Sequence, residues 1–376
     1  MMAKVWTLTG KEELGGDDRL RFTSTTLTGG KSAGVHLVVL KCNDLRISVL
    51  PTRGMNILDV RSADGNIYFG WDSPIPDPVH PMWVPISEPS GLGWLDGFNE
   101  MLVRCGLESN GAPQHNEQGQ LEYPLHGRIA NLPASSVEVE LDEKNGTIRL
   151  TGKVEETRFH IRRSCLTTTI TCNLANPDEV TIVDEVQNLS NRPSDFQLLY
   201  HLNIGSPVLE AGAQFVAPYS LVCPRNDHAA TGMSDWQNFP DASSDYQEQV
   251  YFMRLAGNAE NRTKALLHNA AKDKGFSVGY RVDQLPCFSL WKNTVGHGDG
   301  FVTGLEPAVN YPNRRKFEAE HGRVIPLAPK ETKQFELSLG FHQSGESVNS
   351  VLNEIAGLTA DSPEVHNQPL DELCEP

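Results

Sequence analysis

Apolar and polar residues alternate with a period of two along much of this chain. Residues 137–142 (VEVELD) carry valine or leucine at every second position with acidic residues between them, and residues 147–155 (TIRLTGKVE) repeat the pattern. Side chains of a β-strand point alternately to its two faces, so each segment is predicted to be a strand with one buried face. Asn145-Gly146 lies between the two segments and favours a tight type I′ turn. Together they predict a β-hairpin.

The same alternation occurs at residues 45–51 (LRISVLP) and 334–341 (QFELSLGF), and β-rich runs bounded by turn residues occur at 36–40, 165–172 and 195–202. We count roughly eighteen candidate strands. The 32 glycines and 24 prolines suit the turns between them. No regular alternation of strands and helices is present, which disfavours a parallel α/β sheet. The sequence therefore predicts a nearly all-β fold built from two stacked antiparallel sheets, with few short helices.

Helical patterns are few. One face of a helix is predicted by the spacing of four apolar residues, with Gly357 as the expected stop; they are Val348, Val351, Leu352 and Ile355. Residues 93–107 (GWLDGFNEMLVRCGL) form a second, weaker helix candidate. The tail from about Thr359 is acidic and contains proline, so we expect it to be loosely ordered. The chain is thus divided into a β-sandwich domain over 1–345 and a short helix with its tail over 346–376.

Residues 70–94 contain six prolines and three tryptophans, Trp71, Trp83 and Trp94. Proline stiffens a loop, and long loops inside compact domains are often functional. Two interpretations remain open. The segment is either a stiff cover packed over a sheet face, or part of a binding rim whose aromatic rings lie against the apolar face of a sugar.

Composition narrows the classes of partner. The formal net charge is −16 and the pI is near 5.2, which argues against nucleic acid and anionic membranes, because both need a basic face. No run is long and apolar enough to span a bilayer, and the first residues lack the apolar core of a secretion signal. The seven cysteines are odd in number and irregularly spaced, which indicates reduced thiols and a cytoplasmic location. A small sugar or another small polar molecule remains open as the partner.

Two residues are candidates for proton transfer. His201 ends the strand-like run FQLLYH, where modest burial or a nearby carboxylate could tune a side chain that titrates near neutral pH. Glu306 lies between Leu305 and Pro307, and loss of water would raise its pKa toward the range of a general base. The alternatives are a core histidine bonded to a carbonyl, and a glutamate paired with an arginine such as Arg314 or Arg315.

Four further residues are candidates for substrate contacts. Arg53 follows a strand in LPTRGMNI, Arg104 lies in MLVRCGL, and His126 and Arg128 share the run LHGR. On a regular strand His126 and Arg128 would face the same side, which favours a shared pocket.

Metal and nucleophile chemistry have little support in the sequence. His297 and Asp299 share a glycine-rich turn, but two ligands are too few for a metal site. Neither a glycine-rich phosphate loop nor a G-x-S-x-G nucleophile motif occurs. We expect neither a metal nor a cofactor.

Several motifs together resemble the galactose mutarotase-like superfamily, and within it a bacterial aldose 1-epimerase-like family of largely unknown function. They run in order from about residue 45 to residue 312: LPTRGMNILDV, GWLDGFNEMLVRCGLESNG, YPLHGRIANLPA, LLYHLNIG and GLEPAVNYP. The resemblance implies a β-supersandwich whose broad concave sheet binds the sugar.

The resemblance also implies roles for single residues. His201 matches the general acid and Glu306 the general base. His126 matches a histidine that binds the sugar near its ring oxygen, and an upstream arginine, Arg104 or Arg53, would contact the hydroxyl groups. Arg128 resembles an arginine of the hexose-phosphate epimerase branch, although here it directly follows the glycine.

Mutarotation needs these residue types. A base removes the proton of the anomeric hydroxyl while an acid protonates the ring oxygen, and reclosure of the opened ring gives the other anomer. The leading hypothesis is an aldose 1-epimerase-like enzyme. The alternatives are a sugar-binding protein without turnover, and another enzyme on the same scaffold such as a sugar-phosphate epimerase, which would need converging arginines. The sequence leaves a homodimer open.

Overall fold

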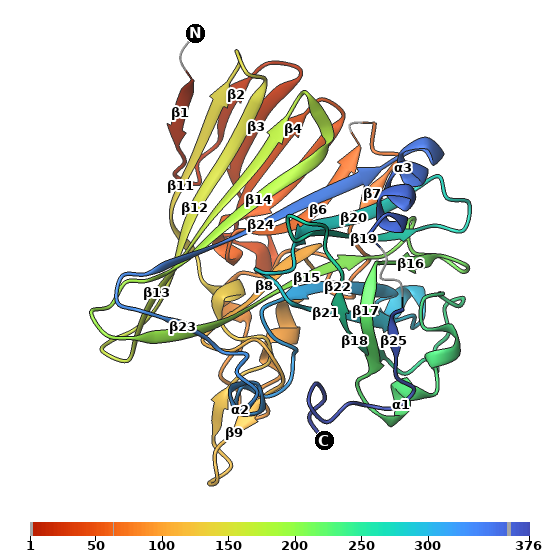
Figure 1. Cartoon of the computed structure of the whole chain (residues 1–376). Coiled ribbons are helices and arrows are strands. Elements are labelled where there is room, and N and C mark those ends of the chain that lie inside the picture. The colour runs from red at the N-terminus through yellow and green to blue at the C-terminus, as the bar shows by residue number, and fades with distance from the viewer. Residues whose placement is uncertain (1–2, 63, 359–361) are drawn as a thin grey trace.

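Two large, mainly antiparallel β-sheets, packed face to face, form the body of the computed structural model, which describes residues 3–62, 64–358 and 362–376 (Figure 1). The smaller sheet has nine strands, in the order β1 (Lys4–Thr7), β11 (Ala134–Asp142), β12 (Thr147–Arg158), β13 (Arg162–Asn173), β14 (Asn176–Asn188), β24 (Thr332–His342), β20 (Gly275–Arg281), β19 (Arg262–His268) and β16 (Gln214–Val216). This architecture confirms the predicted antiparallel β-supersandwich.

The larger sheet has fourteen strands. Its main order is β2 (Glu13–Gly16), β3 (Leu20–Thr26), β4 (His36–Cys42), β5 (Leu45–Leu50), β6 (Asn56–Ser62), β8 (Leu102–Leu107), β15 (Ser194–Ile204), β22 (Val302–Ala308), β21 (Cys287–Asn293), β18 (Gln249–Leu255), β17 (Tyr219–Pro224) and β25 (Glu364–Val365). Strand β7 (Tyr68–Phe69) pairs with β6, and β23 (Ile325–Leu327) pairs with β15. A separate hairpin consists of β9 (Gln114–His115) and β10 (Leu121–Tyr123).

The predicted hairpin of β11 and β12 is present, but its turn is not the predicted one. Asp142 pairs with Thr147, so four residues rather than two connect the strands. Gly146 has a φ of 64°, whereas Asn145 is not among the residues with positive φ, as a type I′ turn would require. The Asp142 side chain instead accepts hydrogen bonds from the amides of Lys144 and Asn145. This local acceptor stabilises the longer turn.

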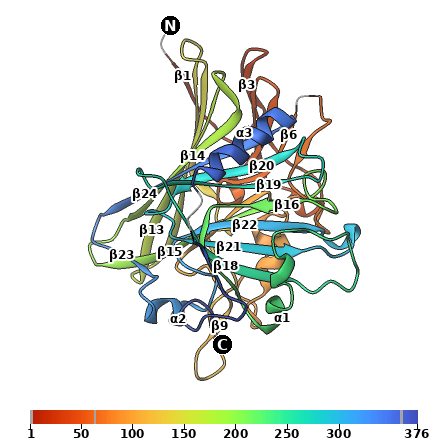
Figure 2. The same ribbon diagram turned by 45° about the vertical axis from the view of Figure 1, so that its right-hand side comes forward.

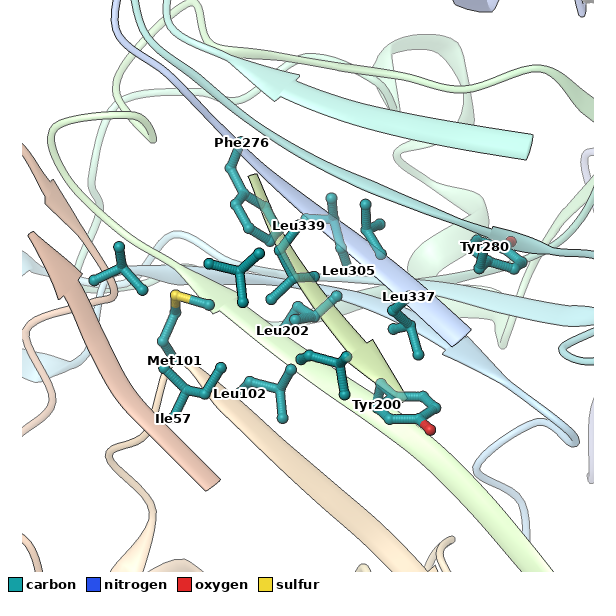
Figure 3. Packing of buried hydrophobic residues seen from close by; sticks show 14 of the residues in the cluster. Ile57, Met101, Leu102, Tyr200, Leu202, Phe276, Tyr280, Leu305, Leu337 and Leu339 are labelled. Atoms are coloured by element: carbon teal, nitrogen blue, oxygen red, sulfur yellow. The ribbon is translucent and has the colours of Figure 1, made fainter. Parts of the chain in front are cut away.

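A hydrophobic core fills the space between the sheets. Figure 3 shows part of it, with Leu202 and Leu305 of the larger sheet close to Leu337 and Leu339 of the smaller one. The alternation noted in the sequence produces this core, because the inward-facing residues of the long central strands such as β12 and β13 are buried. At Gly152 an added Cβ would lie 2.2 Å from the Met55 sulfur, so the absence of a side chain lets the sheets approach.

The larger sheet is also buried on its outer face. In β15 the even-numbered residues from Phe196 to Ile204 face the inter-sheet core, whereas Leu199 packs in a second apolar cluster on the opposite face. That cluster includes Trp71, Trp94 and Phe98 from the loop region 70–99, and Leu373 and Cys374 from the end of the chain. The proline-rich segment therefore covers part of the outer face, and its role as a binding rim stays a prediction.

The helices are few and short: α1 (Asp227–Ala230), α2 (Arg315–Glu320) and α3 (Gly345–Ala356). The predicted C-terminal helix is confirmed as α3. Its residues Val348, Val351 and Ile355 pack on Leu266 of β19, and Figure 2 shows α3 lying over β20 and β19, away from β22 and β21. No helix within the described residues is long and apolar enough to cross a membrane.

Two expectations about local structure are wrong. Residues 93–107 form a short 3₁₀ turn (Gly93–Gly97) followed by β8, because Val103 and Cys105 pack on the outer face of the sheet while Leu102 and Leu107 face the core. Residues 362–376 of the expected loose tail are packed: β25 pairs with β17, and Leu373 is fully buried. Residues 359–361 of that tail lie outside the described residues, and the domain division at residue 345 remains a prediction.

Candidate active site

His201 and Glu306 meet on the outer face of the larger sheet. Strand β15 pairs with β22 so that Leu202 lies opposite Leu305, and this register puts His201 opposite Glu306 on the face away from the core. His201 Nε2 lies 3.2 Å from Glu306 Oε1. The two residues are only 5% and 3% exposed. The two proton-transfer candidates are thus side-chain neighbours in a nearly dry environment.

Gly304 makes room for this contact. An added Cβ at this position would lie 2.8 Å from Glu306 Oε1 and 3.1 Å from His201 Cε1. A side chain would therefore push the carboxyl group or the imidazole out of place. Gly304 is therefore needed because the site has no room for a side chain, and not because the backbone turns there.

Asn203 sets the tautomer of His201. Its amide nitrogen donates to the backbone carbonyl oxygens of Glu100 (2.9 Å) and His201 (3.3 Å), so its Oδ1 faces His201 Nδ1 at 2.7 Å. An amide oxygen can only accept, so Nδ1 carries a proton. In the neutral imidazole, Nε2 then presents a lone pair to Glu306.

Burial shifts both members of the pair toward their neutral forms. It raises the pKa of Glu306 to about 8, with the nearby Arg225 lowering and Glu248 raising the pKa of this carboxyl group. Burial also lowers the pKa of His201 to about 3. Near neutral pH the carboxyl group of Glu306 is therefore protonated and donates a hydrogen bond to His201 Nε2, so these two facing groups share one proton. Transfer of that proton across 3.2 Å converts the pair to carboxylate and imidazolium.

His126 approaches the pair from a turn. Its ring centroid lies 5.4 Å from that of His201 and 4.6 Å from that of Trp94. Nδ1 donates to the Asn110 carbonyl (2.9 Å), which leaves Nε2 as an acceptor. Burial lowers the pKa of His126 to about 4, so this acceptor stays neutral at ordinary pH. Asn110 is held in turn by reciprocal side-chain hydrogen bonds with Asn310 (2.7 and 2.8 Å), which follows β22.

The prediction that His126 and Arg128 face the same side assumed a regular strand, but the chain forms a turn at these residues. His126 has a φ of 55° and Gly127 a φ of 73°, both in the left-handed region. At Gly127 a Cβ would lie 2.0 Å from the Ser109 carbonyl oxygen. The turn directs Arg128 toward the cover, where its Nη1 donates to Ser87 Oγ (3.1 Å). Arg128 is thus bonded to the proline-rich segment and not to His126.

Arg53 and Arg104 are buried in ion pairs and reach no exposed surface. Arg53 pairs with Glu100 (2.9 Å), and its side chain is 2% exposed. Arg104 pairs with Asp184 of the opposite sheet at 2.5 Å, and both side chains are fully buried in the inter-sheet region. The predicted direct contacts with sugar hydroxyl groups therefore do not fit either arginine. Arg53 supports the site indirectly, because it holds Glu100, whose carbonyl accepts from Asn203.

Sequence analysis missed several side chains near the pair. Aromatic rings pack around His201, with centroid distances of 5.4 Å to Phe98, 5.4 Å to Trp291 and 6.4 Å to Trp94. Arg225 follows β17 and acts electrostatically on both Glu306 and His126. Glu248 accepts a hydrogen bond from Trp291 Nε1 (2.7 Å). Two of them carried a signal in the sequence: Trp94 lies in the proline-rich segment with its tryptophans, and Asn203 lies two residues after His201 and so on the same strand face.

The structure also bears on the predicted arginine pairing, on metal ligands and on the cysteines. The alternative pairing of Glu306 with an arginine is wrong, because Arg314 pairs with Glu375 and Arg315 with Asp195. Within the described ranges, no cluster of three or more potential ligands could hold a metal ion. All seven cysteines are free and buried in this structure, and their redox state stays a prediction.

Two hollows on the protein surface lie away from the His201–Glu306 pair. One of about 830 Å³ is lined by residues 27–32 and 74–79, and one of about 740 Å³ lies beside the β9–β10 hairpin and α2. Neither includes His201 or Glu306. The site is therefore identified by its chemistry, since both members of the pair are nearly buried in this conformation.

Comparisons with known proteins identify the family and the fold of this chain. Residues 32–341 match the family described as a domain of unknown function, DUF4432. A candidate aldose 1-epimerase from Klebsiella pneumoniae has a similar structure, with a TM-score of 0.93, 34% identity and coverage of 98% of this chain and 99% of that one. A search of curated protein sequences finds no significant match.

More distant structures share the fold. A galactose mutarotase-like protein from Clostridium acetobutylicum has a TM-score of 0.60 at 12% identity, over 87% of this chain and all of that one. The galactose 1-epimerase of Lactobacillus acidophilus has a TM-score of 0.54 at 13% identity, over 86% and 99% of the two chains. The chain therefore has the galactose mutarotase-like fold and belongs to the DUF4432 family.

Proposed function

We propose that this protein is an aldose 1-epimerase-like enzyme that interconverts the anomers of a sugar or sugar derivative. The observation that carries the proposal is the buried His201–Glu306 pair, which holds one proton between an acid and a base 3.2 Å apart. The two oxygens of a hemiacetal are bonded to the same carbon, so an acid and a base lying side by side can serve both. The fold and the name of the Klebsiella relative support the same class of reaction.

In the proposed reaction the sugar enters between the pair and its aromatic cover. Glu306, as carboxylate, removes the proton of the anomeric hydroxyl group, while His201 donates its Nε2 proton to the ring oxygen. The C1–O5 bond breaks and an open-chain aldehyde forms. Rotation about C1–C2 and reversal of the two proton transfers close the ring as the other anomer. The pair ends with the single proton that it had at the start.

The surrounding groups bind and orient. His126 Nε2 accepts from a sugar hydroxyl group near the ring oxygen, and Trp94 and Trp291 offer apolar faces to the ring. Arg225 supplies a positive charge close to both Glu306 and His126. Because His201 and Glu306 are nearly inaccessible, side chains of the cover must shift to admit the sugar. The arginine cluster that a sugar-phosphate epimerase would need is not formed, since Arg53 and Arg104 lie in separate buried pairs.

The test is anomer exchange, measured by NMR on a panel of free aldoses and aldose derivatives, with ligand binding measured on the same samples. We expect exchange well above the buffer rate for at least one sugar that also binds. Binding of a sugar without accelerated exchange would identify a carbohydrate-binding protein instead. If no sugar of the panel binds and none shows accelerated exchange, both the enzyme and the carbohydrate-binding protein are contradicted.

The pH profile of exchange should show a broad plateau. Above about pH 8 the pair loses its single proton, so the acid is missing, and at strongly acidic pH it gains a second one, so the base is missing. We expect kcat/KM to fall about tenfold per pH unit on the alkaline side. Arg225→Gln removes a charge that lowers the pKa of Glu306 and should move this limb to higher pH, whereas Glu248→Gln should move it to lower pH. Shifts in the same direction would contradict the assignment of the limb to Glu306.

A further inference from the structure

Two cysteines from distant parts of the chain meet on the outer face of the larger sheet. Cys223 lies in β17, and Cys374 lies close to the C-terminus. Their sulfur atoms are 3.8 Å apart, and the residues are 0% and 4% exposed. Cys223 occupies the same cross-strand row as the active-site pair, which runs from Glu306 through Ser289 and Phe252 to Cys223.

The C-terminal segment reaches Cys223 by a path with defined contacts. β25 adds to the edge of β17 as a parallel strand, and the chain then crosses the outer face. Asn313 Nδ2 donates to the Leu373 carbonyl (2.9 Å), and Arg323 Nη1 donates to the Glu372 carbonyl (2.9 Å). Figure 1 shows this end of the chain returning beneath the sheet near α1 and α2. Cys374 is thus placed against Cys223 by the surrounding fold.

We propose that Cys223 and Cys374 form a reversible disulfide that fastens the C-terminal segment over the outer face of the sheet, with a low-molecular-weight disulfide of the glutathione class as oxidant. Bond formation requires the sulfur atoms to move from 3.8 Å to about 2.05 Å. Side-chain rotation together with a small displacement of the segment can supply this movement.

The reaction proceeds by two exchanges. The Cys374 thiolate attacks the small disulfide, which forms a mixed disulfide and releases one thiolate. The Cys223 thiolate then attacks the Cys374 sulfur, which closes the protein disulfide and releases a second thiolate. The two protons lost by the cysteines are taken up by the two released thiolates. The hydrogen bond from Cys223 lowers the pKa of Cys374, which makes Cys374 the attacking group, and the same contact raises the pKa of Cys223.

The disulfide would act on the candidate active site through Pro224 and Arg225. The Cys374 sulfur lies 3.5 Å from the Pro224 carbonyl oxygen, and the next residue is Arg225, the cation close to Glu306 and His126. Asn313, which holds the segment, lies in the loop that follows β22, the strand of Glu306. Fastening the segment therefore restrains two elements that position the site.

The test uses the full-length protein, reduced and then incubated with oxidised glutathione, followed by peptide mapping without reduction. We expect a cross-linked peptide pair containing Cys223 and Cys374, which dithiothreitol cleaves. Closing a loop this long should raise Tm by about 3–5 °C, reversibly. Digestion of the C-terminal segment by carboxypeptidase should slow in the oxidised form.

Two variants sharpen the test. In Cys223→Ser the second exchange cannot occur, so glutathione should remain attached to Cys374. Cys165, at 7% exposed, is more accessible than either partner and would react first if exposure alone decided the reaction. Cys165→Ser is therefore the control, and it should leave the Cys223–Cys374 cross-link unchanged. The wild-type map alone decides the matter even if a variant fails to fold. Glutathione adducts without a cross-link, a cross-link between other cysteines, or no reaction would each overturn the proposal.

Discussion

Glu306→Gln should slow anomer exchange by about 10³-fold, the range expected when a positioned general base is removed. Glutamine cannot take the proton of the anomeric hydroxyl group. Its amide can still donate to His201 Nε2 as the protonated carboxyl does, so the geometry of the pair is expected to persist. The effect should therefore appear in the rate and not in the fold.

The measurement is the exchange rate on the most active sugar of the panel, with sugar affinity and thermal stability determined for the same protein. We expect affinity within a few-fold of the wild type and an unchanged Tm. Glu140→Gln is the matched control, because it changes the same residue type in a half-exposed pair with Arg149 on the smaller sheet and should alter the rate little. Exchange by Glu306→Gln within threefold of the wild-type rate would remove Glu306 from the mechanism.

Asp184→Asn should lower the free energy of unfolding by about 3–5 kcal/mol, the usual cost of leaving one member of a buried ion pair alone. Asp184 accepts from Arg104 Nε at 2.5 Å between the two sheets, and both side chains are fully buried. Arg104 Nη1 donates to the Met55 carbonyl (2.9 Å), so the guanidinium cannot leave without breaking a second contact. Its charge would remain in the core without a counterion.

Denaturant unfolding checks this prediction through the midpoint at constant m-value. The double variant Arg104→Met with Asp184→Leu should recover most of the loss, because it removes both charges and keeps apolar volume. Arg149→Met is the control for a surface pair. It breaks the half-exposed contact with Glu140 and should cost less than about 1 kcal/mol. Equal effects of the buried and the exposed changes would contradict the structural role of the Arg104–Asp184 pair.

Period-two alternation predicted the strands of the smaller sheet well, because strands such as β12 bury one face and leave the other partly exposed. Alternation did not predict the local structure where a side chain bonds the backbone or where a strand is buried on both faces. The turn between β11 and β12 follows the side chain of Asp142, which offers its own acceptor to the backbone. Residues 93–107 have apolar residues on both faces because β8 is buried on both sides, and such a run resembles a helix in sequence.

The sequence predicted the residues of the catalytic pair but not which side chains contact one another. His201 and Glu306 were identified as proton-transfer candidates from their contexts and from resemblance to a known family. That they contact each other depends on the register of β15 against β22, which a single sequence does not contain. Arg53 and Arg104 have equally suggestive contexts, but their partners Glu100 and Asp184 come from distant segments.

The sequence by itself determined the β-sandwich class, most strand positions, the C-terminal helix and the residue types available for acid–base chemistry, because these depend on local periodicity and on short motifs. Only the tertiary structure decided which polar groups face the same side of the sheet and which are paired in the core. The reason is physical: strand pairing and burial bring together residues about one hundred or more positions apart, as in His201 with Glu306 and Cys223 with Cys374. Burial then shifts the pKa of each buried group in a direction that composition alone could not give.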